Sequence, residues 1–256
     1  MFKDYLCLGV IGNVPNHLNQ ANEAKDFTEL HTSDFAPKGV FPFYSKDSDK
    51  EYLKRFCISE NELILDGDFV QIEPELCVIF KAFYENDKLS DLKPQFYAAF
   101  NDASKRVNEN KISSKKNFST ASKGIGNLVP LNNLDELNDY KIHCYLKRDN
   151  EIIKYANEDY IKNYFYYSNT LITWLIDTIN NQIDIATLED IRPLIASKPA
   201  NLLICLGALS YTPFGEKHYL KNNDEIFVAI SKNDEFINVK DGSCLHQIVK
   251  SNNSSK

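Results

Sequence analysis

The sequence lacks the features of a membrane or secreted protein. None of its apolar runs is long enough to span a bilayer. Its first twelve residues, MFKDYLCLGVIG, carry Asp4 and lead into a polar stretch without a small-residue cleavage site, so we expect no signal peptide. Its six cysteines form no C-x-x-C pair, and five of them lie within or beside apolar runs. We therefore expect a cytoplasmic protein with reduced cysteines in its core.

Positive charge is also in short supply. The 29 lysines and arginines are outnumbered by 36 aspartates and glutamates, which gives a net charge of −7 at pH 7. This balance argues against nucleic acid as the main partner. One segment, 105–123, is nevertheless locally basic. It predicts either a site for a small anionic ligand or a solvated loop, and composition alone leaves both open.

Length and composition are those of an ordinary globular protein, without internal repeats. With 256 residues, of which 43% are hydrophobic and 25% charged, the chain can bury a sizeable core. We expect one folded unit, in which an N-terminal segment, 1–60, precedes a core at 61–250 and the polar residues 251–256 form a disordered tail.

Short strands dominate the apolar pattern. Two helices are predicted, at 169–182, with Ser168, Asn169 or Thr170 as N-cap, and at 187–197. The polar stretches 22–39 and 105–127 are predicted to be long loops. The expected fold class is mixed β, of the α+β type. Alternation and β-branched enrichment predict strands near 5–11, 68–81, 142–148, 201–207 and 225–231, and shorter ones at 62–65 and 235–239, while 95–100 fits either a strand or a helix.

The stretch GDFVQIEPELCVIF, residues 67–80, places two carboxylates inside an apolar run. Side chains alternate along a strand, so Glu73 and Glu75 face the same side, about 7 Å apart along the backbone. Pro74 between them indicates an edge, an end or a bulge. Two buried carboxylates repel each other and need compensation, which Mg²⁺ or Mn²⁺ would supply. The pattern alone equally allows an exposed edge strand with two solvated acids.

Other polar motifs follow in a definite order along the chain. Taken together, the order G-N-x-x-x-H, E-x-E, N-D-x-S-x-R, Lys-Gly, N-T-L-x-x-x-L and T-P-x-G resembles the fumarylacetoacetate hydrolase superfamily over nearly the whole chain. The segments that carry the resemblance, besides the E-x-E stretch, are IGNVPNH (11–17), FNDASKR (100–106), SKGIGNLVP (122–130), NTLITWL (169–175) and LSYTPFGEKHYLKNNDEI (209–226).

The resemblance implies rolled, mixed β-sheets with a few short helices around a polar pocket. It also implies that Glu73, Glu75 and Asp102 hold Mg²⁺ or Mn²⁺. Three carboxylates neutralise a divalent ion and leave coordination positions open, through which an oxo-acid can bind and have its carbonyl polarised.

The resemblance assigns further roles to five other residues. Lys123 matches the lysine that meets the substrate's carboxylate or keto oxygen, and Lys116, in KKNFST, is the competing candidate for that role. His17 matches the histidine that serves as base or orients a water molecule. Arg106 and Thr212 match residues that contact the anionic substrate.

The implied activity is that of a metal-dependent C–C hydrolase, decarboxylase or isomerase. The substrate would be a small 2-oxo or 1,3-dicarbonyl carboxylate that reacts through an enolate, and a homodimer is expected. Several positions depart from the family pattern, among them Gln20, where many members have a glutamate, and Tyr211, where they have a glycine. They favour an alternative, a non-catalytic relative that binds small anions and retains the fold. A metal-free structural protein with solvated acids is a third interpretation.

Overall fold

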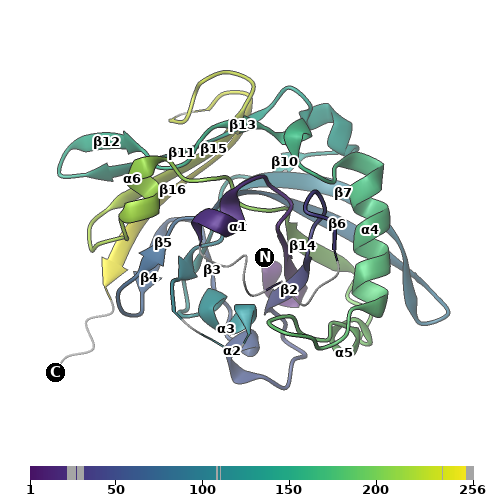
Figure 1. Ribbon diagram of the computed structural model, residues 1–256. Coiled ribbons are helices and arrows are strands. Elements are labelled where there is room, and N and C mark those ends of the chain that lie inside the picture. The colour runs from purple at the N-terminus through teal and green to yellow at the C-terminus, as the bar shows by residue number, and fades with distance from the viewer. Residues whose placement is uncertain (22–26, 28–31, 108, 110, 238, 252–256) are drawn as a thin grey trace.

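The computed structural model describes residues 1–21, 27, 32–107, 109, 111–237 and 239–251 (Figure 1). Within this part of the chain, most residues that form strands belong to a large sheet whose members come from both ends of the sequence. Its strands are β1 (Leu6–Ile11), β2 (Gly39–Tyr44), β3 (Ile58–Ser59), β6 (Pro74–Glu85), β7 (Lys88–Asn101), β9 (Lys123–Ile125), β10 (Val129–Pro130) and β14 (Asn201–Cys205). They lie in the order β2-β1-β14-β6-β7-β9-β3, and β10 pairs with β7.

A second sheet packs against the first. It has the order β12-β11-β15-β16-β4, with β13 paired to β11, while β5 (Val70–Gln71) and β8 (Ser104–Lys105) form a separate two-stranded ladder. Neighbouring strands are antiparallel in most pairs, but β1–β14, β3–β9 and β16–β4 are parallel. The strands of the second sheet are β4 (Glu62–Leu65), β11 (Lys141–Arg148), β12 (Glu151–Lys154), β13 (Asp159–Tyr160), β15 (Glu225–Ser231) and β16 (Gly242–Ser251).

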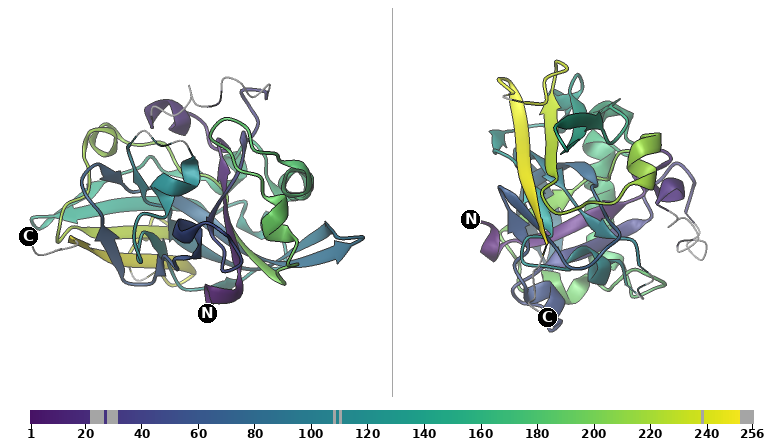
Figure 2. Two further views of the ribbon diagram at one scale, coloured as in Figure 1. Left: turned by 90° about the horizontal axis from the view of Figure 1, so that it is seen from below. Right: turned by 90° about the vertical axis from the view of Figure 1, so that its left-hand side faces the viewer.

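The longest strands, β6 and β7, form a hairpin that runs through the first sheet and projects at one side of the molecule (Figure 2). Asn86 and Asp87 make its two-residue turn with φ angles of 48° and 64°, as a turn with two left-handed residues requires. Pro74 is the first residue of β6, a position where the missing N–H group costs no ladder bond. The predicted strand at 68–81 is therefore divided into β5 and β6, with a break before Pro74.

Both faces of β6 are buried. Leu76, Val78 and Phe80 pack into a larger hydrophobic cluster that is shared with the second sheet, whereas Cys77 and Ile79 pack into a smaller cluster with β1 and β2. A strand buried on both sides reads as a nearly continuous apolar run. Glu75 lies on the side of Cys77, so it extends the face that belongs to the smaller cluster.

The helices are short, with one exception. The long helix α4 packs against β7 through its buried residues Leu171, Leu175 and Ile179, which confirms the helix predicted at 169–182. Its N-cap is Tyr167, without a side-chain hydrogen bond, so none of the polar residues predicted for that position caps it. The helices are α1 (His17–Gln20), α2 (Glu51–Lys54), α3 (Ile112–Lys116), α4 (Ser168–Asn181), α5 (Arg192–Ile195) and α6 (Pro213–Lys217), with 3-10 turns at Phe2–Asp4, Leu134–Leu137 and Ile161–Asn163.

Several predicted elements differ from the observed ones. The helix predicted at 187–197 is reduced to α5, because an isolated bridge between Ile185 and Leu188 occupies the preceding residues. The predicted loop 105–127 contains α3 and β9. Residues 235–237 and 239 form no strand, and residue 238 lies outside the described residues. Half of the loop predicted at 22–39 also lies outside them, as do residues 252–256 of the tail predicted at 251–256. Ser251, the first residue of that predicted tail, instead ends β16. The segment 95–100 is strand, within β7.

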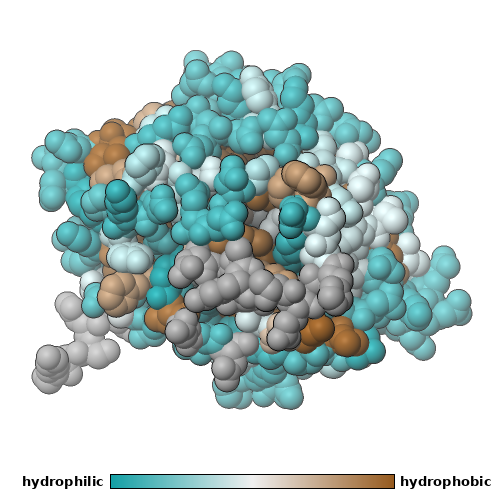
Figure 3. All heavy atoms as spheres, viewed as in Figure 1, coloured by the Kyte–Doolittle hydropathy of each residue, from teal (hydrophilic) through white to brown (hydrophobic). Residues whose placement is uncertain are grey.

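The predicted fold class, mixed β with a few short helices, is confirmed. Within the described residues, no helix has both the length and the apolar character that crossing a membrane would need. The face shown in Figure 3 is mostly hydrophilic, with small and separate hydrophobic patches.

Candidate functional site

Glu73, Glu75 and Asp102 meet where β6 begins and β7 ends. The hairpin register pairs Pro74 with Asn101 and Glu75 with Phe100. The alignment continues one step further, because the N–H of Asp102 donates to the carbonyl oxygen of Glu73 at 2.9 Å and the side-chain oxygen of Asn101 accepts from the N–H of Glu73 at 3.2 Å. One ligand atom from each of the three acids lies within 4.8 Å of the other two.

All three acids are buried. Glu73 and Glu75 are each 3% exposed and Asp102 is 0% exposed. This excludes the interpretation as an exposed edge strand with solvated acids. Buried carboxylates need charged or hydrogen-bonding partners, so the surroundings of the cluster determine what it can bind.

Two cationic side chains contact Glu73. The ammonium group of Lys116 lies 2.5 Å from Oε2 of Glu73 and also contacts Oδ2 of Asp102. The guanidinium of Arg106 donates to Oε1 of Glu73 at 2.8 Å. Burial alone would raise the pKa of Glu73, but Lys116 and Arg106 hold that pKa well below its usual range.

Glu75 has a different environment. Its Oε2 accepts a 2.8 Å hydrogen bond from the backbone N–H of Gly207. Gly207 has a φ of +121°, a conformation that favours glycine, so the sequence places a glycine where the chain must turn toward this carboxylate. Burial, reinforced by repulsion from Asp102, raises the pKa of Glu75 well above its usual range. A bound cation would therefore favour ionisation of Glu75, the acid whose pKa is raised.

His17 opens α1 and reaches the same cluster. Its Nδ1 lies 2.8 Å from the carbonyl oxygen of Leu209, and since a carbonyl can only accept, this nitrogen carries the hydrogen. The lone pair of the neutral ring is therefore on Nε2. Nε2 lies 3.7 Å from Oε2 of Glu73 and has no hydrogen-bond partner among the described residues. His17 thus presents a proton-accepting atom next to the acids.

The departures from the family pattern at Gln20 and Tyr211 have defined positions. The amide of Gln20 makes two hydrogen bonds with the backbone of Tyr211, at 2.7 and 3.1 Å, so it fixes that segment and leaves the orientation of His17 to Leu209. The phenol oxygen of Tyr211 accepts from Arg106 at 2.6 Å, and its ring centroid lies 5.3 Å from that of His17. Tyr211 therefore packs beside His17 and holds Arg106 in place.

A pocket opens onto this cluster. Its polar lining comes from Asn13, His17, Glu73, Glu75 and Lys116. The apolar part of the lining comes from four elements, β1, α1, β2 and α3, and from two loop positions. Its residues are Val10, Ile11, Val14, Leu18, Phe41, Ile112 and Ala208. A pocket with an apolar wall and a charged floor suits a small ligand that carries both an anionic group and a short carbon chain.

Lys123 and Thr212 do not line this pocket as far as the described residues define it. Lys123 is fully buried behind Asp102, with its ammonium group 2.6 Å from Oδ1 of Asp102 and 2.7 Å from the carbonyl oxygen of Ala103. Burial lowers the pKa of Lys123, and the contact with Asp102 offsets this only in part. The hydroxyl of Thr212 caps α6 and contacts the carbonyl oxygens of Lys154 and Tyr155.

The structure also shows supporting residues that sequence reasoning missed. Asn13 is fully buried and makes three hydrogen bonds. Its side chain donates to the carbonyl oxygens of Tyr166 and Leu206 and accepts from the N–H of Tyr166, which ties the segment before His17 to the end of β14. Gln71 accepts from Arg106 at 2.6 Å and donates to the carbonyl oxygen of Gly215. Asn13 stands in the G-N motif, which was the available signal, but nothing in the sequence marks Gln71.

The donor set fits a hard divalent cation. Three carboxylates on rigid elements are the ligands that Mg²⁺ and Mn²⁺ prefer. Burial and repulsion from Asp102 raise the pKa of Glu75 although Lys116 acts in the opposite direction, so a bound cation would favour the charged form of this acid. Lys116 contacts two of the three acids, so an ion bound by all three would compete with its ammonium group.

Comparisons with known proteins give a family and a fold. Residues 23–255 match the model of a family of unknown function, DUF5718, so the chain belongs to that family. No curated protein matches the chain.

Among solved structures, 2-keto-3-deoxy-D-arabinonate dehydratase complexed with magnesium and 2,5-dioxopentanoate is 16% identical, with a TM-score of 0.56 over 96% of this chain and 73% of that one. Cg1458 with an inhibitor is 14% identical, with a TM-score of 0.61 over 96% and 77%. The 5-carboxymethyl-2-hydroxymuconate delta-isomerase from Mycobacterium smegmatis is 12% identical, with a TM-score of 0.55 over 96% and 78%. The fold predicted from the resemblance to the fumarylacetoacetate hydrolase superfamily is confirmed by these solved structures.

Proposed function

We propose that this member of DUF5718 is a divalent-metal-dependent enzyme that acts on a small 2-oxo or 1,3-dicarbonyl carboxylate through an enolate. The observation that carries the proposal is the convergence of Glu73, Glu75 and Asp102, all buried, beside a pocket that Glu73 and Glu75 line together with His17 and Lys116. The similar dehydratase structure holds magnesium and a 2-oxo acid, which supports the same class of ligands here.

Glu73, Glu75 and Asp102 would hold Mg²⁺ or Mn²⁺. When bound, the ion would polarise the carbonyl oxygen of the substrate and stabilise the enolate that forms from it. Lys123 would keep Asp102 oriented from behind, since its ammonium group is held between Oδ1 of Asp102 and the carbonyl oxygen of Ala103. This position makes Lys123 a positioning residue and gives the contact with substrate to Lys116, the alternative lysine.

His17 is the proposed general base. Its Nδ1–H is held by Leu209, so Nε2 can take a proton from a water molecule or from a substrate carbon without any change of tautomer. The contact between Nε2 and Glu73, at 3.7 Å, would stabilise the imidazolium that results. Lys116 and Arg106, which both contact Glu73, supply positive charge for the substrate's carboxylate. Thr212 caps α6 and would support the site indirectly, by fixing the backbone segment that carries Tyr211.

Metal binding and turnover test the proposal separately. Calorimetry with Mn²⁺ should show one site in the wild-type protein and at least tenfold weaker binding in Glu73→Gln and Asp102→Asn. Glu85→Gln, at the exposed end of the same strand, is the matched control and should bind Mn²⁺ as the wild type does. Turnover is then measured with oxaloacetate and an acylpyruvate, with and without Mn²⁺. Equal Mn²⁺ binding in all four proteins would falsify the metal assignment.

A second function, non-catalytic binding of a small anion, is favoured by one observation. Lys116 and Arg106 both contact Glu73, so the site holds cationic groups that an anion can contact without a metal ion. This function predicts metal-independent binding of oxalate or pyruvate and no turnover of either test substrate. Metal-dependent turnover excludes it.

We also infer a homodimer in the cytoplasm, on the basis of the family resemblance and the composition. Light scattering on the purified protein should give twice the mass of the chain, and a mass of one chain would contradict the dimer.

A further inference from the structure

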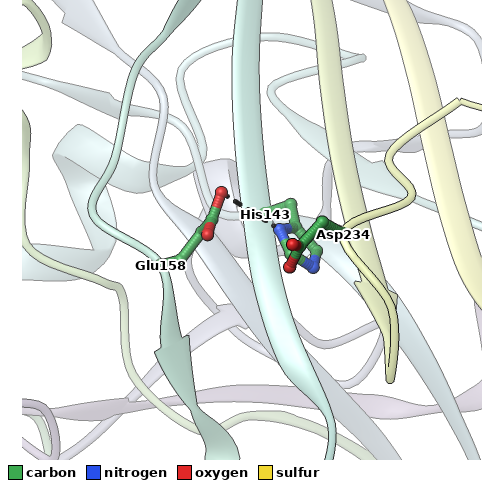
Figure 4. A group of neighbouring side chains, drawn as sticks. All are labelled: His143, Glu158 and Asp234. Carbon is green, nitrogen blue, oxygen red and sulfur yellow. Dashed lines mark ion pairs between the residues drawn. The ribbon is translucent and has the colours of Figure 1, made fainter.

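A second group of possible ligands lies on the opposite face of the second sheet from its core. His143 is in β11, where its neighbours Ile142 and Cys144 point into the larger hydrophobic cluster. His143 therefore points the other way. Figure 4 shows Glu158 and Asp234 beside its ring. Glu158 comes from the segment between β12 and β13, and Asp234 from the segment between β15 and β16.

The ring of His143 is buried without adequate hydrogen bonds. The residue is 0% exposed, and neither ring nitrogen has a hydrogen-bond partner among the described residues. Its Nδ1 lies 3.3 Å from Oε1 of Glu158, a close contact without the angle of a hydrogen bond. An unsatisfied buried polar group costs about 1–3 kcal/mol. The two ring nitrogens would recover this cost if a ligand bound to the ring of His143.

The geometry points to a metal ion as that ligand. One atom each from His143, Glu158 and Asp234 lies within 4.8 Å of the other two. We propose that these three residues bind a divalent transition-metal ion of the Zn²⁺ class. One imidazole with two carboxylates suits such an ion better than Mg²⁺, because imidazole is a ligand that Zn²⁺, Co²⁺ and Ni²⁺ favour. The donors are one neutral nitrogen and two anionic oxygens, which leaves a coordination position for water.

Nearby lysines neutralise the carboxylates while no ion is bound. Lys154 lies 2.9 Å from Oε1 of Glu158, and Lys141 lies 3.2 Å from Oδ1 of Asp234. Both pairs reach solvent, since Glu158 is 21% and Asp234 79% exposed in their side chains. The exposed pair at Asp234 contributes only about 0–1 kcal/mol, so a metal ion can displace Lys141. At Glu158, which is partly buried, the ion would compete with Lys154 and with the hydroxyl of Tyr145, which donates to Oε1 at 3.1 Å.

The proposed ion has a structural consequence. It joins the segment between β15 and β16 to β11, a connection that the stacked rings of Tyr145 and Phe236 already begin, with centroids 3.9 Å apart. The ion would therefore stiffen this segment rather than take part in the reaction at Glu73 and Glu75.

Zn²⁺ titrations on full-length variants test the site. Asp234→Asn removes an exposed ligand and should leave the fold intact, and His143→Gln removes the buried one. Asp241→Asn, which changes an exposed aspartate in the same segment outside the group, is the matched control. The double variant Glu73→Gln, Glu75→Gln serves as the background, so that binding at the first acidic cluster cannot be mistaken for binding here.

In that background we expect one equivalent of Zn²⁺, retained with Asp241→Asn and weakened at least tenfold by Asp234→Asn or His143→Gln. Bound Co²⁺ should give visible absorption that Asp234→Asn removes. Zn²⁺ should also slow tryptic cleavage after Lys232 and Lys240 in the background protein but not in the variant with Asp234→Asn. The site is rejected if the background protein binds no Zn²⁺, or if it binds Zn²⁺ equally well with and without Asp234. Either result leaves the function proposed for the first cluster unaffected.

Discussion

At the scale of single residues, the ammonium group of Lys116 occupies a position that a metal ion would also need. It contacts both Glu73 and Asp102, and its own backbone belongs to α3, a helix of five residues. Two cations that share the same carboxylates repel each other, so each weakens the binding of the other. The lysine therefore limits metal affinity and, in the proposed function, provides charge for the substrate.

Replacement of Lys116 by methionine separates these two effects. Mn²⁺ should bind about tenfold more tightly to the variant, a gain of about 1.4 kcal/mol, because the competing charge is gone. Turnover of the oxo-acid should fall, since the substrate's carboxylate loses a partner. Lys105→Met, which removes a lysine paired with Asp66 outside the pocket, is the control for both measurements. Weaker Mn²⁺ binding in Lys116→Met would contradict the competition.

His17 gives a second prediction at this scale. His17→Gln keeps a polar side chain of similar length but removes the basic nitrogen. A positioned base contributes a factor of about 10²–10⁴, so kcat should fall by at least that lower factor. The Kd for Mn²⁺ should change less than twofold, because His17 is not among the three proposed metal ligands. An unchanged kcat would remove His17 from the mechanism.

The buried thiol of Cys57 predicts a pH dependence of stability. Burial raises the pKa of Cys57 to about 12, from an ordinary value of 9.0. Between these values the unfolded chain loses the proton and the folded protein keeps it. The folded state then binds more protons, so the free energy of unfolding must fall as the pH rises above 9, by at most about 1.4 kcal/mol for each pH unit from this group.

Urea unfolding at several pH values between 8 and 11 checks this prediction. In Cys57→Ala the free energy of unfolding should fall less steeply with pH. The cavity that the substitution leaves should lower this free energy by a similar amount at every pH. Cys244→Ala, at a half-buried position, should reduce the slope less. Equal slopes in the wild type and Cys57→Ala would show that the thiol does not titrate in this way.

At the scale of elements, the end of α4 protects a strand edge. β2 is the last strand of the first sheet, and the side-chain amide of Gln182 both accepts from the N–H of Val40 at 2.9 Å and donates to its carbonyl oxygen at 2.7 Å. Asn180 does the same for Leu89 in β7. Unpaired strand edges favour association between chains, and these amides occupy the groups concerned.

Gln182→Ala should therefore destabilise the protein by about 1–3 kcal/mol, the cost of leaving buried backbone groups unsatisfied. Asn181→Ala is the matched control, because within the described part of the chain the side chain of Asn181 bonds only to Asp177 in its own helix. Its effect should stay below about 0.5 kcal/mol. Chemical denaturation measures both. A similar loss in the two variants would mean that helix propensity, and not the strand edge, explains the effect.

The elements that could be predicted from the sequence are those with a clear period. Helix α4 shows its apolar stripe, and β11, β14 and β15 show short apolar or alternating runs. The strand β2 could not be predicted, because Pro42 interrupts its pattern and is tolerated only at a sheet edge, a position that tertiary structure decides. Helix α3 was missed because five residues are too few to show a period.

The same distinction holds for the site. Sequence reasoning brought together Glu73, Glu75 and Asp102 because the ordered motifs carry that information. It could not choose between Lys116 and Lys123, since the direction of each side chain depends on how α3 and β9 pack around Asp102. A contact between Gln71 and Arg106 follows from the β5–β8 ladder, which the sequence does not reveal.

At the scale of the whole molecule, the N-terminal segment is built into the sheet that carries the acids. β1 is buried along its entire length and lies between β2 and β14, which in turn pairs with β6. Removal of residues 1–60 would take away three strands, β1, β2 and β3, expose β14 and delete His17. We predict that residues 61–256 alone show no cooperative unfolding transition by circular dichroism, whereas the full chain does. A folded fragment would establish 61–250 as an independent domain.

The contact between His17 and Leu209 spans 192 residues, and Glu75 receives its hydrogen bond from Gly207. A ribosome must therefore release most of the chain before the pocket can be completed. Until then the nascent protein carries its charged residues and apolar strands without their final partners. Proteins dominated by such distant contacts fold slowly and are exposed to aggregation during synthesis. Production of this protein in a foreign host should consequently improve at low temperature or with added chaperones.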